Sequence, residues 1–431
     1  MCMKCKEEKA VLITRVNDAF CRACFMVYVT HKFRAAIGKS KLIRDGEQVL
    51  VGYSGGQSSS CLLHLIQEGL SERAHKKLRF QPALLFIDEG AVTDMPHEER
   101  RIIHEKIVQL MEGTGYFYHV RSLEQAMELD IIDKKTGESD GEPRVPELHG
   151  NESSSPVFYP ELEQKLKSLL NSLKTLSAKE EMIRQLRQCL MISVARQHNY
   201  SKIMVGECST QLAVKLLSDI AQGRGAHVSM ETTFADRRHG DLITVRPIRD
   251  FSSKEVAIYN KLCNVETIFI PTLTTKTQEG STIEHLTEAF VTGLQTDYLS
   301  TVSNIIRTGE KLSTDVSKEQ NCALCQAPLD TDVPVSSALN AVEFSMQVSR
   351  KKTETTKVKE DSSCCGEGDG SCHSQTDCIN RKDIDSELCY GCRLIVNDLD
   401  DINELPPYLL KEISWRSRRS KMKSDIQQYL L

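Results

Sequence analysis

The sequence has few aromatic residues and no long apolar run. Aromatic side chains make up 6% of its 431 residues, and there is a single tryptophan. No apolar stretch approaches the roughly 20 residues that a membrane-spanning helix requires. The polar segment 1–6 has no apolar core for a signal peptide. A membrane-embedded or exported protein is therefore not expected, and the sequence predicts a cytoplasmic protein.

Cysteine, by contrast, is abundant, with 16 residues in the chain. In a reducing compartment, paired cysteines hold metal more often than they form disulfides. Two C-x-x-C pairs near the start of the chain are separated by 15 residues, which is typical of a four-thiolate zinc ribbon. The predicted ligands are Cys2, Cys5, Cys21 and Cys24, and the alternative is four incidental thiols.

A second cysteine set is split by 63 residues, with its pairs formed by Cys322, Cys325, Cys389 and Cys392. The intervening segment 330–388 is polar and rich in glycine and serine, so it cannot bury enough surface to order itself. We predict a disordered insertion within one zinc module, because loop-closure cost grows slowly with length. Its own cysteines are interpreted as surface thiols: Cys364, Cys365, Cys372 and Cys378.

Neither sign of charge dominates the composition. The chain has 55 lysines and arginines against 60 acidic residues, a net charge of −5 at pH 7. Composition alone therefore gives no indication of nucleic-acid binding. Basic residues are nevertheless clustered; one cluster is by default a solvated face, but several beside two zinc modules favour an RNA surface. The selected phosphate contacts are Arg34, Lys39, Lys41, Arg44, Arg184 and Arg187.

The most informative stretch is a short apolar run that ends at a glycine-rich break. Val49–Tyr53 is typical of a buried strand, Ser54-Gly55-Gly56 interrupts it, and a helical pattern follows through Ile66. Two glycines let successive backbone N–H groups turn toward one point, and the helix adds its N-terminal dipole. With nearby serine hydroxyls, the loop is an anion cradle whose expected occupant is phosphate.

Two other interpretations of this loop remain open. The glycines can serve sterics alone, in a tight strand–helix turn. The segment 52–56 also fits G-x-S-x-G, the nucleophile elbow of serine hydrolases, with Ser54 as nucleophile. That elbow requires a later acid and histidine, and neither His239 nor His285 lies in a recognisable context.

Strand-like and helix-like segments alternate along the middle of the chain. Apolar segments at 83–88, 116–120, 202–205 and 243–246 predict further strands, with helical patterns between them and a loop at 133–158. This alternation predicts an α/β fold with a doubly wound parallel sheet. Ligands of such sheets lie outside the carboxyl ends of the strands. The predicted nucleotide site is therefore Ser54, Gly55, Gly56, Ser59, Asp88 and Gly206.

These residues resemble a known family. A strand, Ser54-Gly55-Gly56-x-x-Ser59 and a helix are similar to the PP-loop ATP pyrophosphatases, with their adenine nucleotide alpha hydrolase-like fold and usual SGGxDS motif. The added zinc ribbons resemble the tRNA thiolation branch, most closely the cytoplasmic tRNA 2-thiolation protein 2 family. The resemblance covers the chain outside 133–158 and 330–388, and its supporting segments are 18–25, 31–34, 54–60, 223–226, 238–241 and 245–250.

The resemblance implies a role in placing sulfur on the wobble uridine of tRNA. In active relatives, ATP adenylates the uridine carbonyl oxygen, and sulfur then displaces AMP. The family works as a heterodimer with a catalytic paralogue, and a thiocarboxylated ubiquitin-related modifier supplies sulfur. Two structural zinc ions are implied, and ATP is left open as a ligand.

The chain departs from the active pattern in two places. Ser58 occupies the acidic position of SGGxDS. Active relatives also carry a C-x-x-C on the helix before the fourth strand and a later third cysteine, whereas that helix here has only Cys189 and segment 267–272 has none. Cys208 and Cys263 are interpreted as packing residues. No iron–sulfur cluster and no independent thiolation are therefore expected.

We predict a non-catalytic subunit that completes a tRNA-binding surface. The alternatives are an enzyme that adenylates tRNA in its own right, the serine hydrolase, and a zinc scaffold without tRNA contact. The predicted parts are an N-terminal zinc ribbon at 1–30, a PP-loop-like domain at 31–312, a C-terminal zinc module at 313–400 and a basic helix or tail at 401–431.

Overall fold

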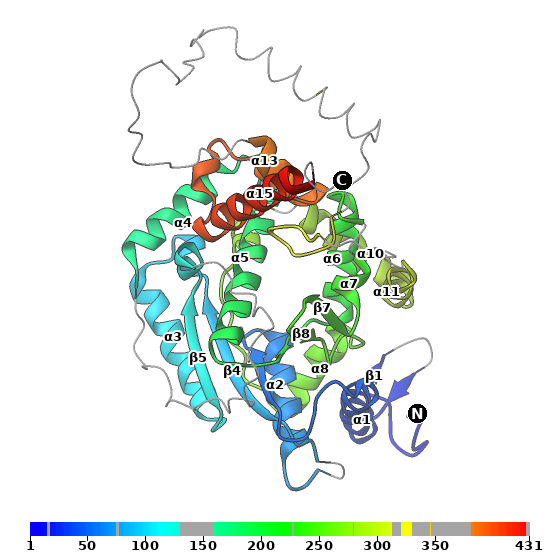
Figure 1. Cartoon of the computed structure of the whole chain (residues 1–431). Helices are drawn as coiled ribbons and strands as arrows, with labels where there is room; N and C mark the ends of the chain where they lie inside the picture. Colours follow the sequence, from blue (N-terminus) through cyan, green and yellow to red (C-terminus); the bar gives the residue numbers. More distant parts are fainter. Residues whose placement is uncertain are drawn as a thin grey trace, which may run out of the picture.

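A six-stranded sheet forms the centre of the molecule (Figure 1). The computed structural model describes residues 1–14, 18–74, 77–129, 158–225, 228–278, 280–312, 320–329, 345 and 381–427. The strand order is β5-β4-β3-β6-β8-β7. The bounds are β3 Gln48–Gly52, β4 Gln81–Asp88, β5 Phe117–Ser122, β6 Lys202–Met204, β7 Ala235–His239 and β8 Leu242–Val245.

Five of these strands are parallel, which confirms the predicted doubly wound sheet. In the register, Val51 of β3 lies between Leu84 of β4 and Met204 of β6. The sixth strand, β7, is antiparallel to β8 and was not predicted. The sheet is therefore mixed at one edge.

Alternation along β3 explains why helices cover both faces. Val49 and Val51 pack with α1, α2, α3 and α8 on one face, whereas Leu50 packs with α5 on the other. Such a two-sided apolar strand is typical of a parallel sheet. The helices of this layer have the bounds α1 Arg22–Ser40, α2 Gln57–Leu70, α3 His97–Glu112, α5 Leu176–Gln197, α6 Ser209–Ala221, α7 Val228–Thr232 and α8 Ser253–Cys263.

The remaining elements lie around this layer. The segment 282–312, predicted to hold one helix, contains two, α10 and α11. None of the helices in the described ranges is long and apolar enough to cross a bilayer. The bounds are β1 Leu12–Ile13, β2 Ala19–Phe20, η1 Gly90–Thr93, η2 Leu123–Glu128, α4 Pro160–Ser172, α9 Leu273–Lys276, α10 Ile283–Asp297, α11 Thr301–Lys311, α13 Arg381–Ser386, α14 Tyr390–Asn397, η4 Ile402–Glu404 and α15 Pro407–Gln427.

The terminal modules share their cores with the α/β layer. The boundary predicted at 30/31 lies inside α1, whose Phe25 and Phe33 belong to the same apolar cluster as β3. The C-terminal cysteines pack in one cluster with α4, α5 and α15. The predicted insertion 330–388 is corrected at its end, because 381–386 form α13; most of the rest, like nearly all of the predicted loop 133–158, lies outside the described residues.

Candidate phosphate loop and cysteine clusters

The segment 53–56 joins β3 to α2, and close packing requires glycine at two positions, one in this loop and one beside it. Gly55 has φ +74°, and a side chain there would meet Ile107 Cδ1 at 2.6 Å. Gly206, after β6, approaches the loop so closely that a Cβ would lie 3.0 Å from Ser58 O and Ser59 Cα. The loop is therefore held between α3 and the end of β6.

The hydroxyl groups of the loop contact one another. Ser54 Oγ and Ser59 Oγ lie 3.0 Å apart, and Ser59 Oγ donates to Gly56 O at 3.1 Å. Ser58, at the position where the SGGxDS motif has an acid, donates to Gln211 Oε1 at 3.2 Å. Gly56 is the N-cap of α2 and supplies no side chain to its first N–H groups, a geometry that suits a phosphate.

The loop is held in place by α8 and by the segment that follows it. Ile268 N donates to Gly55 O at 2.8 Å, and Gln57 Nε2 donates to Thr267 Oγ1 at 3.2 Å. Asn260 Nδ2 donates to Gln57 O at 2.9 Å. These contacts fix the loop before any ligand arrives, which favours binding because little ordering remains to be done.

Asp88, predicted to face the nucleotide, is committed to a buried arginine that sequence reasoning missed. Arg100 Nε donates to Asp88 Oδ2 at 2.8 Å, and Arg100 Nη2 lies 2.8 Å from Glu124 Oε1. Asp88 Oδ1 accepts from Gly90 N at 2.8 Å. The carboxylate therefore orders η1 and α3, and its place in the nucleotide site stays a prediction.

A cavity of about 160 Å³ lies beyond the carboxyl end of β4, between η1, α5, α6 and α9. Its walls carry ion pairs. Arg184 binds Glu181 and, at 2.6 Å, Asp219, while Arg187 binds Glu89. Two of the six predicted RNA contacts, Arg184 and Arg187, are thus engaged with carboxylates of the chain itself.

The other four predicted RNA contacts differ from these two in their exposure and in their ion pairing. Lys39, Lys41 and Arg44 are exposed at the end of α1 and in the turn after it, and Arg34 is half-buried on α1. None of the four side chains forms an ion pair within the described part of the chain. Their charges therefore remain accessible to a polyanion.

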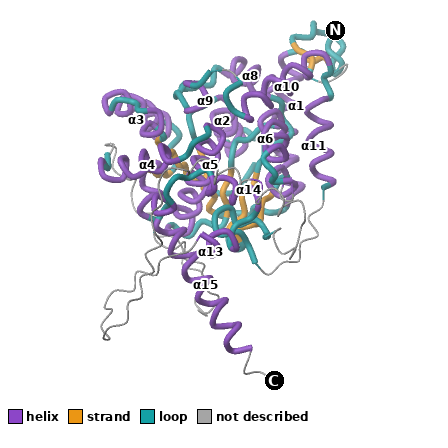
Figure 2. Tube along the Cα trace, turned by 90° about the horizontal axis from the view of Figure 1, so that it is seen from above, coloured by secondary structure: helices purple, strands orange, loops and turns teal. Residues whose placement is uncertain are grey.

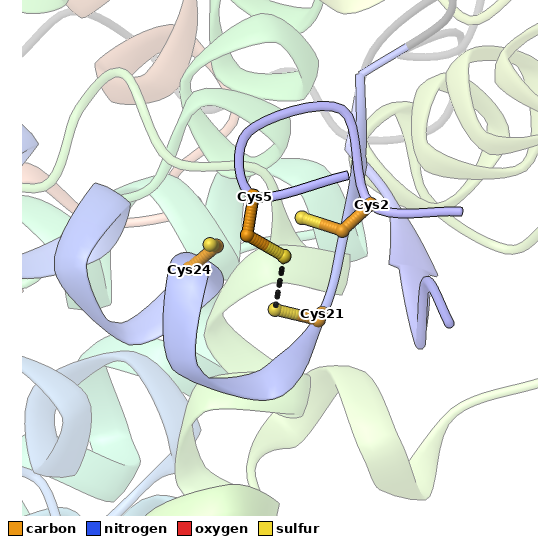
Figure 3. Close-up of side chains that lie close together, drawn as sticks. All are labelled: Cys2, Cys5, Cys21 and Cys24. Carbon is orange, nitrogen blue, oxygen red and sulfur yellow. Dashed lines mark hydrogen bonds between the residues drawn. The ribbon is translucent and has the colours of Figure 1, made fainter. Parts of the chain in front are cut away.

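The N-terminal cysteines converge on one point (Figure 3). Cys2 and Cys5 lie on a turn, Cys21 is the N-cap of α1, and Cys24 lies in its first turn. All four Sγ atoms lie within 4.8 Å of one another, and Cys5 and Cys21 are 3.8 Å apart. Tetrahedral zinc with Zn–S bonds of about 2.3 Å separates its sulfurs by about 3.8 Å, so this cluster fits zinc.

The C-terminal cysteines form a second cluster of the same kind. The Sγ atoms of Cys322, Cys325, Cys389 and Cys392 lie within 4.8 Å, and all four residues are buried. Cys325 and Cys389 are 3.6 Å apart. A four-iron cluster would spread its cysteines further, because each thiolate binds a different metal atom. Both sets therefore fit one zinc ion each.

The other four described cysteines are packing residues. Cys61, Cys189 and Cys208 are buried and Cys263 is half-buried. Tyr408 OH donates to Cys189 Sγ at 3.3 Å, and burial raises the pKa of Cys189 to about 11. Burial also raises the pKa of Cys61 and of Cys263. Such thiols carry little thiolate at neutral pH.

The hydrolase interpretation finds no histidine at the loop. Gln188 Nε2 donates to His239 Nε2 at 3.0 Å, and burial together with the Arg238 charge lowers the pKa of His239 to about 4. No described histidine hydrogen-bonds to Ser54, whose recorded partner is Ser59. The described residues thus hold no serine–histidine pair at this position.

The sheet order and the glycine loop after its first parallel strand define the class of protein, a PP-loop fold. A solved structure agrees: the U34-tRNA thiolase NcsA from Methanococcus maripaludis, determined with its 4Fe-4S cluster, superposes with a TM-score of 0.52. It is 13% identical, and the match covers 74% of this chain and 89% of that one. This likeness shows the fold alone.

Sequence relatives identify the family. The family model for cytoplasmic tRNA 2-thiolation protein 2 matches residues 282–394. The protein of that name from Danio rerio is 42% identical over all of this chain and 94% of its own length, and the one from Homo sapiens is 36% identical over 100% and 93%. The chain belongs to the cytoplasmic tRNA 2-thiolation protein 2 family, which confirms the predicted resemblance.

Proposed function

We propose that this chain is a non-catalytic subunit of the cytoplasmic complex that 2-thiolates the wobble uridine of tRNAs. The family name and the PP-loop fold support the pathway. The catalytic partner would be a PP-loop paralogue, joined to this chain as a heterodimer. A thiocarboxylated ubiquitin-related modifier would bring the sulfur, and both zinc ions would be structural.

The placement of the thiols carries the non-catalytic part of the proposal. Eight of the twelve described cysteines lie in the two clusters, and the other four are buried or half-buried in packing. Sulfur transfer requires an accessible thiolate or a metal–sulfur centre. On α5, where active relatives are expected to carry a cysteine pair, this chain presents Arg184 and Arg187 in ion pairs and Cys189 under Tyr408.

Retention of the loop supports a second candidate, in which this chain still binds ATP and adenylates tRNA with a partner's cysteines. The glycine geometry and the uncapped first turn of α2 favour phosphate binding. Against adenylation, Ser58 replaces the expected carboxylate, and its hydroxyl is bonded to Gln211. A loop that binds phosphate but does not support adenylation is consistent with both observations.

The exposed cations on and after α1 support a role in holding tRNA. Lys39, Lys41 and Arg44 are exposed, and Arg34 lies on the same helix. Lysine and arginine contacts to phosphates give affinity without sequence preference. Such a surface would position tRNA for the catalytic partner.

The proposal is tested in cells that lack this chain. The 2-thiouridine content of purified tRNA, measured by mass spectrometry, should fall to background and return with the wild-type chain. A Cys189→Ser variant should restore thiolation fully, because Cys189 is a packing residue. Loss of thiolation with a stable Cys189→Ser chain would contradict the non-catalytic assignment, and unchanged thiolation without the chain would overturn the pathway.

A further inference from the structure

The C-terminal helix α15 carries a concentrated positive charge. Residues 415–423 include five basic and no acidic residues, in a chain whose net charge is −5. The same segment holds the only tryptophan of the sequence, Trp415. Figure 2 shows α15 running out of the body of the molecule toward the C-terminus.

The inner half of α15 is firmly anchored. Tyr408, Leu409 and Ile413 are buried in the cluster that contains the C-terminal cysteines. Arg416 pairs with Glu412 at 2.7 Å and with Glu387 at 3.6 Å, and it donates to Asn321 O. Since Asn321 precedes Cys322, the zinc module fixes the direction of the helix.

The outer half presents a different surface. Trp415 is 50% exposed and Met422 is 64% exposed. Arg418 and Arg419 are exposed, and the Arg419 guanidinium lies 5.3 Å from the centre of the Trp415 ring. Residues three and four apart share one face of a helix, so Trp415, Arg418 and Arg419 form one surface of an aromatic ring and two cations.

We propose that this surface, the α15 clamp of Trp415, Arg418 and Arg419, binds unpaired nucleotides of tRNA. The two guanidinium groups contact phosphates, and the exposed indole stacks on a base. This inference rests on the proposed function, since tRNA is the substrate it assigns to the complex. It adds a second RNA contact, apart from the α1 cations.

The chemistry of the clamp favours RNA with unpaired bases over other polyanions. Single-stranded nucleic acid is held by a positive surface that follows the backbone and by aromatic side chains that stack on bases. An interfacial membrane helix requires a broad apolar face, whereas the exposed large apolar side chains of the described part of α15 are Trp415 and Met422. A fully paired duplex offers no base for the indole.

The single tryptophan makes the test direct, because tryptophan emission, excited at a wavelength that tyrosine does not absorb, reports on Trp415 alone in the full-length chain. Titration with unmodified tRNA should quench this emission in a saturable way, with the same midpoint as binding measured by anisotropy of labelled tRNA. Trp415→Phe should bind tRNA as the wild type does. Trp415→Ser should bind at least about fivefold more weakly, since a stacked base contributes that much or more.

The charge arm uses a matched control. Arg418→Gln with Arg419→Gln should reduce the slope of log affinity against log salt by about 1.4, as expected for two single-strand phosphate contacts. Lys106→Gln, an exposed cation on α3, should leave the slope unchanged.

Several outcomes would overturn the clamp while leaving the proposed function intact. One is tRNA binding with unchanged tryptophan emission and full affinity of Trp415→Ser. Another is equal quenching by a fully paired RNA duplex, and a third is quenching by phosphatidylserine vesicles but not by tRNA. Failure of the wild-type chain to bind tRNA by anisotropy would instead contradict both the clamp and the tRNA-binding role.

Discussion

Three glycines around the candidate phosphate loop have different surroundings. Substitutions at them can therefore separate nucleotide binding from stability. Gly55 and Gly206 are enclosed, whereas a side chain at Gly56 would meet only Ser54 Oγ within 4 Å, at 3.6 Å. Gly56 therefore borders the space in front of the loop. A Cβ at residue 56 therefore meets no clash.

We expect Gly56→Leu to abolish nucleotide binding while lowering the melting temperature only slightly, because leucine is a poorer helix N-cap than glycine. Gly55→Ala should instead destabilise the chain by about 1–2 kcal/mol, because residue 55 adopts a left-handed conformation. Calorimetry with ATP and AMP, paired with thermal unfolding, measures both effects. Equal ATP affinity in wild type and Gly56→Leu would exclude this loop as the nucleotide site, and no wild-type binding at millimolar ATP would mean that the loop serves packing alone.

His239 makes stability depend on pH. Its pKa is about 4 in the folded chain, where burial opposes the charged form, against about 6.5 in an unfolded chain. Between these pH values the unfolded chain binds a proton that the folded chain does not, so stability falls as the pH drops through this window. Urea unfolding at several pH values should show a slope up to about 1.4 kcal/mol per pH unit steeper for wild type than for His239→Gln. Parallel slopes would refute the assignment.

At the scale of elements, the two cysteine clusters differ in what they hold together. The N-terminal cluster joins a short hairpin to α1 and is partly exposed, whereas the C-terminal cluster is buried with α4, α5 and α15. Metal binding is coupled to folding in such sites. Loss of the second ion should therefore affect more of the molecule.

We predict two zinc ions per chain by elemental analysis, one in each cluster. Cys5→Ser and Cys392→Ser should each retain one ion, but only Cys392→Ser should markedly lower the melting temperature, because it opens the buried core. A wild-type chain purified without chelator that holds less than one zinc would contradict the prediction. Equal destabilisation by the two variants would contradict the structural distinction between the clusters.

Sequence reasoning found the apolar strands and missed the charged one. The centres of β3 and β4 are continuous apolar runs, and β5 is rich in aromatic and β-branched residues, so their pattern was sufficient. The edge strand β7 buries Asp236 and Arg238, which pair at 2.7 Å, and such charged residues do not predict a strand. Pairing of buried charges is a tertiary property that a local pattern does not contain.

In the candidate site, the cysteine clusters were predictable from the sequence, but the partners of the buried and half-buried side chains were not. Both cysteine sets follow from spacing, and the structure brings each set together. The partners of Arg184, Asp88 and Cys189 lie 35, 12 and 219 residues away, as Asp219, Arg100 and Tyr408. Such separations leave no periodic signal in the sequence. The hydrogen-bond partners of these residues could therefore only be found from the structure.

At the scale of the whole molecule, the predicted divisions do not correspond to separate cores. Helix α1 joins the N-terminal cluster to the sheet, and α15 joins the C-terminal cluster to α5. The order of the motifs, from which the domain boundaries were predicted, carries no information on how far each apolar core extends. Both terminal modules are therefore packed against the central α/β layer.

The cations predicted to bind tRNA fall into two groups, those in ion pairs on α5 and the exposed ones on and after α1. Substitutions should affect stability in the first group and tRNA binding in the second. Arg184→Gln should lower the free energy of unfolding by about 3 kcal/mol, since it leaves the buried Asp219 without its ion-pair partner. Neutralising Lys39, Lys41 and Arg44 together should change stability little and reduce the salt slope of tRNA binding by about 2. Chemical unfolding and filter binding measure the two effects. A stable Arg184→Gln with weakened tRNA binding would reverse the assignment.

The most direct test of the central claim is reconstitution with purified components. Wild-type chain, its catalytic paralogue, tRNA, ATP and a sulfur donor are combined, and 2-thiouridine is counted per chain by mass spectrometry. We expect no thiolation by this chain alone, multiple turnovers by the pair, and full activity of a pair in which this chain carries Cys189→Ser. Multiple turnovers by this chain without the paralogue would contradict the central claim.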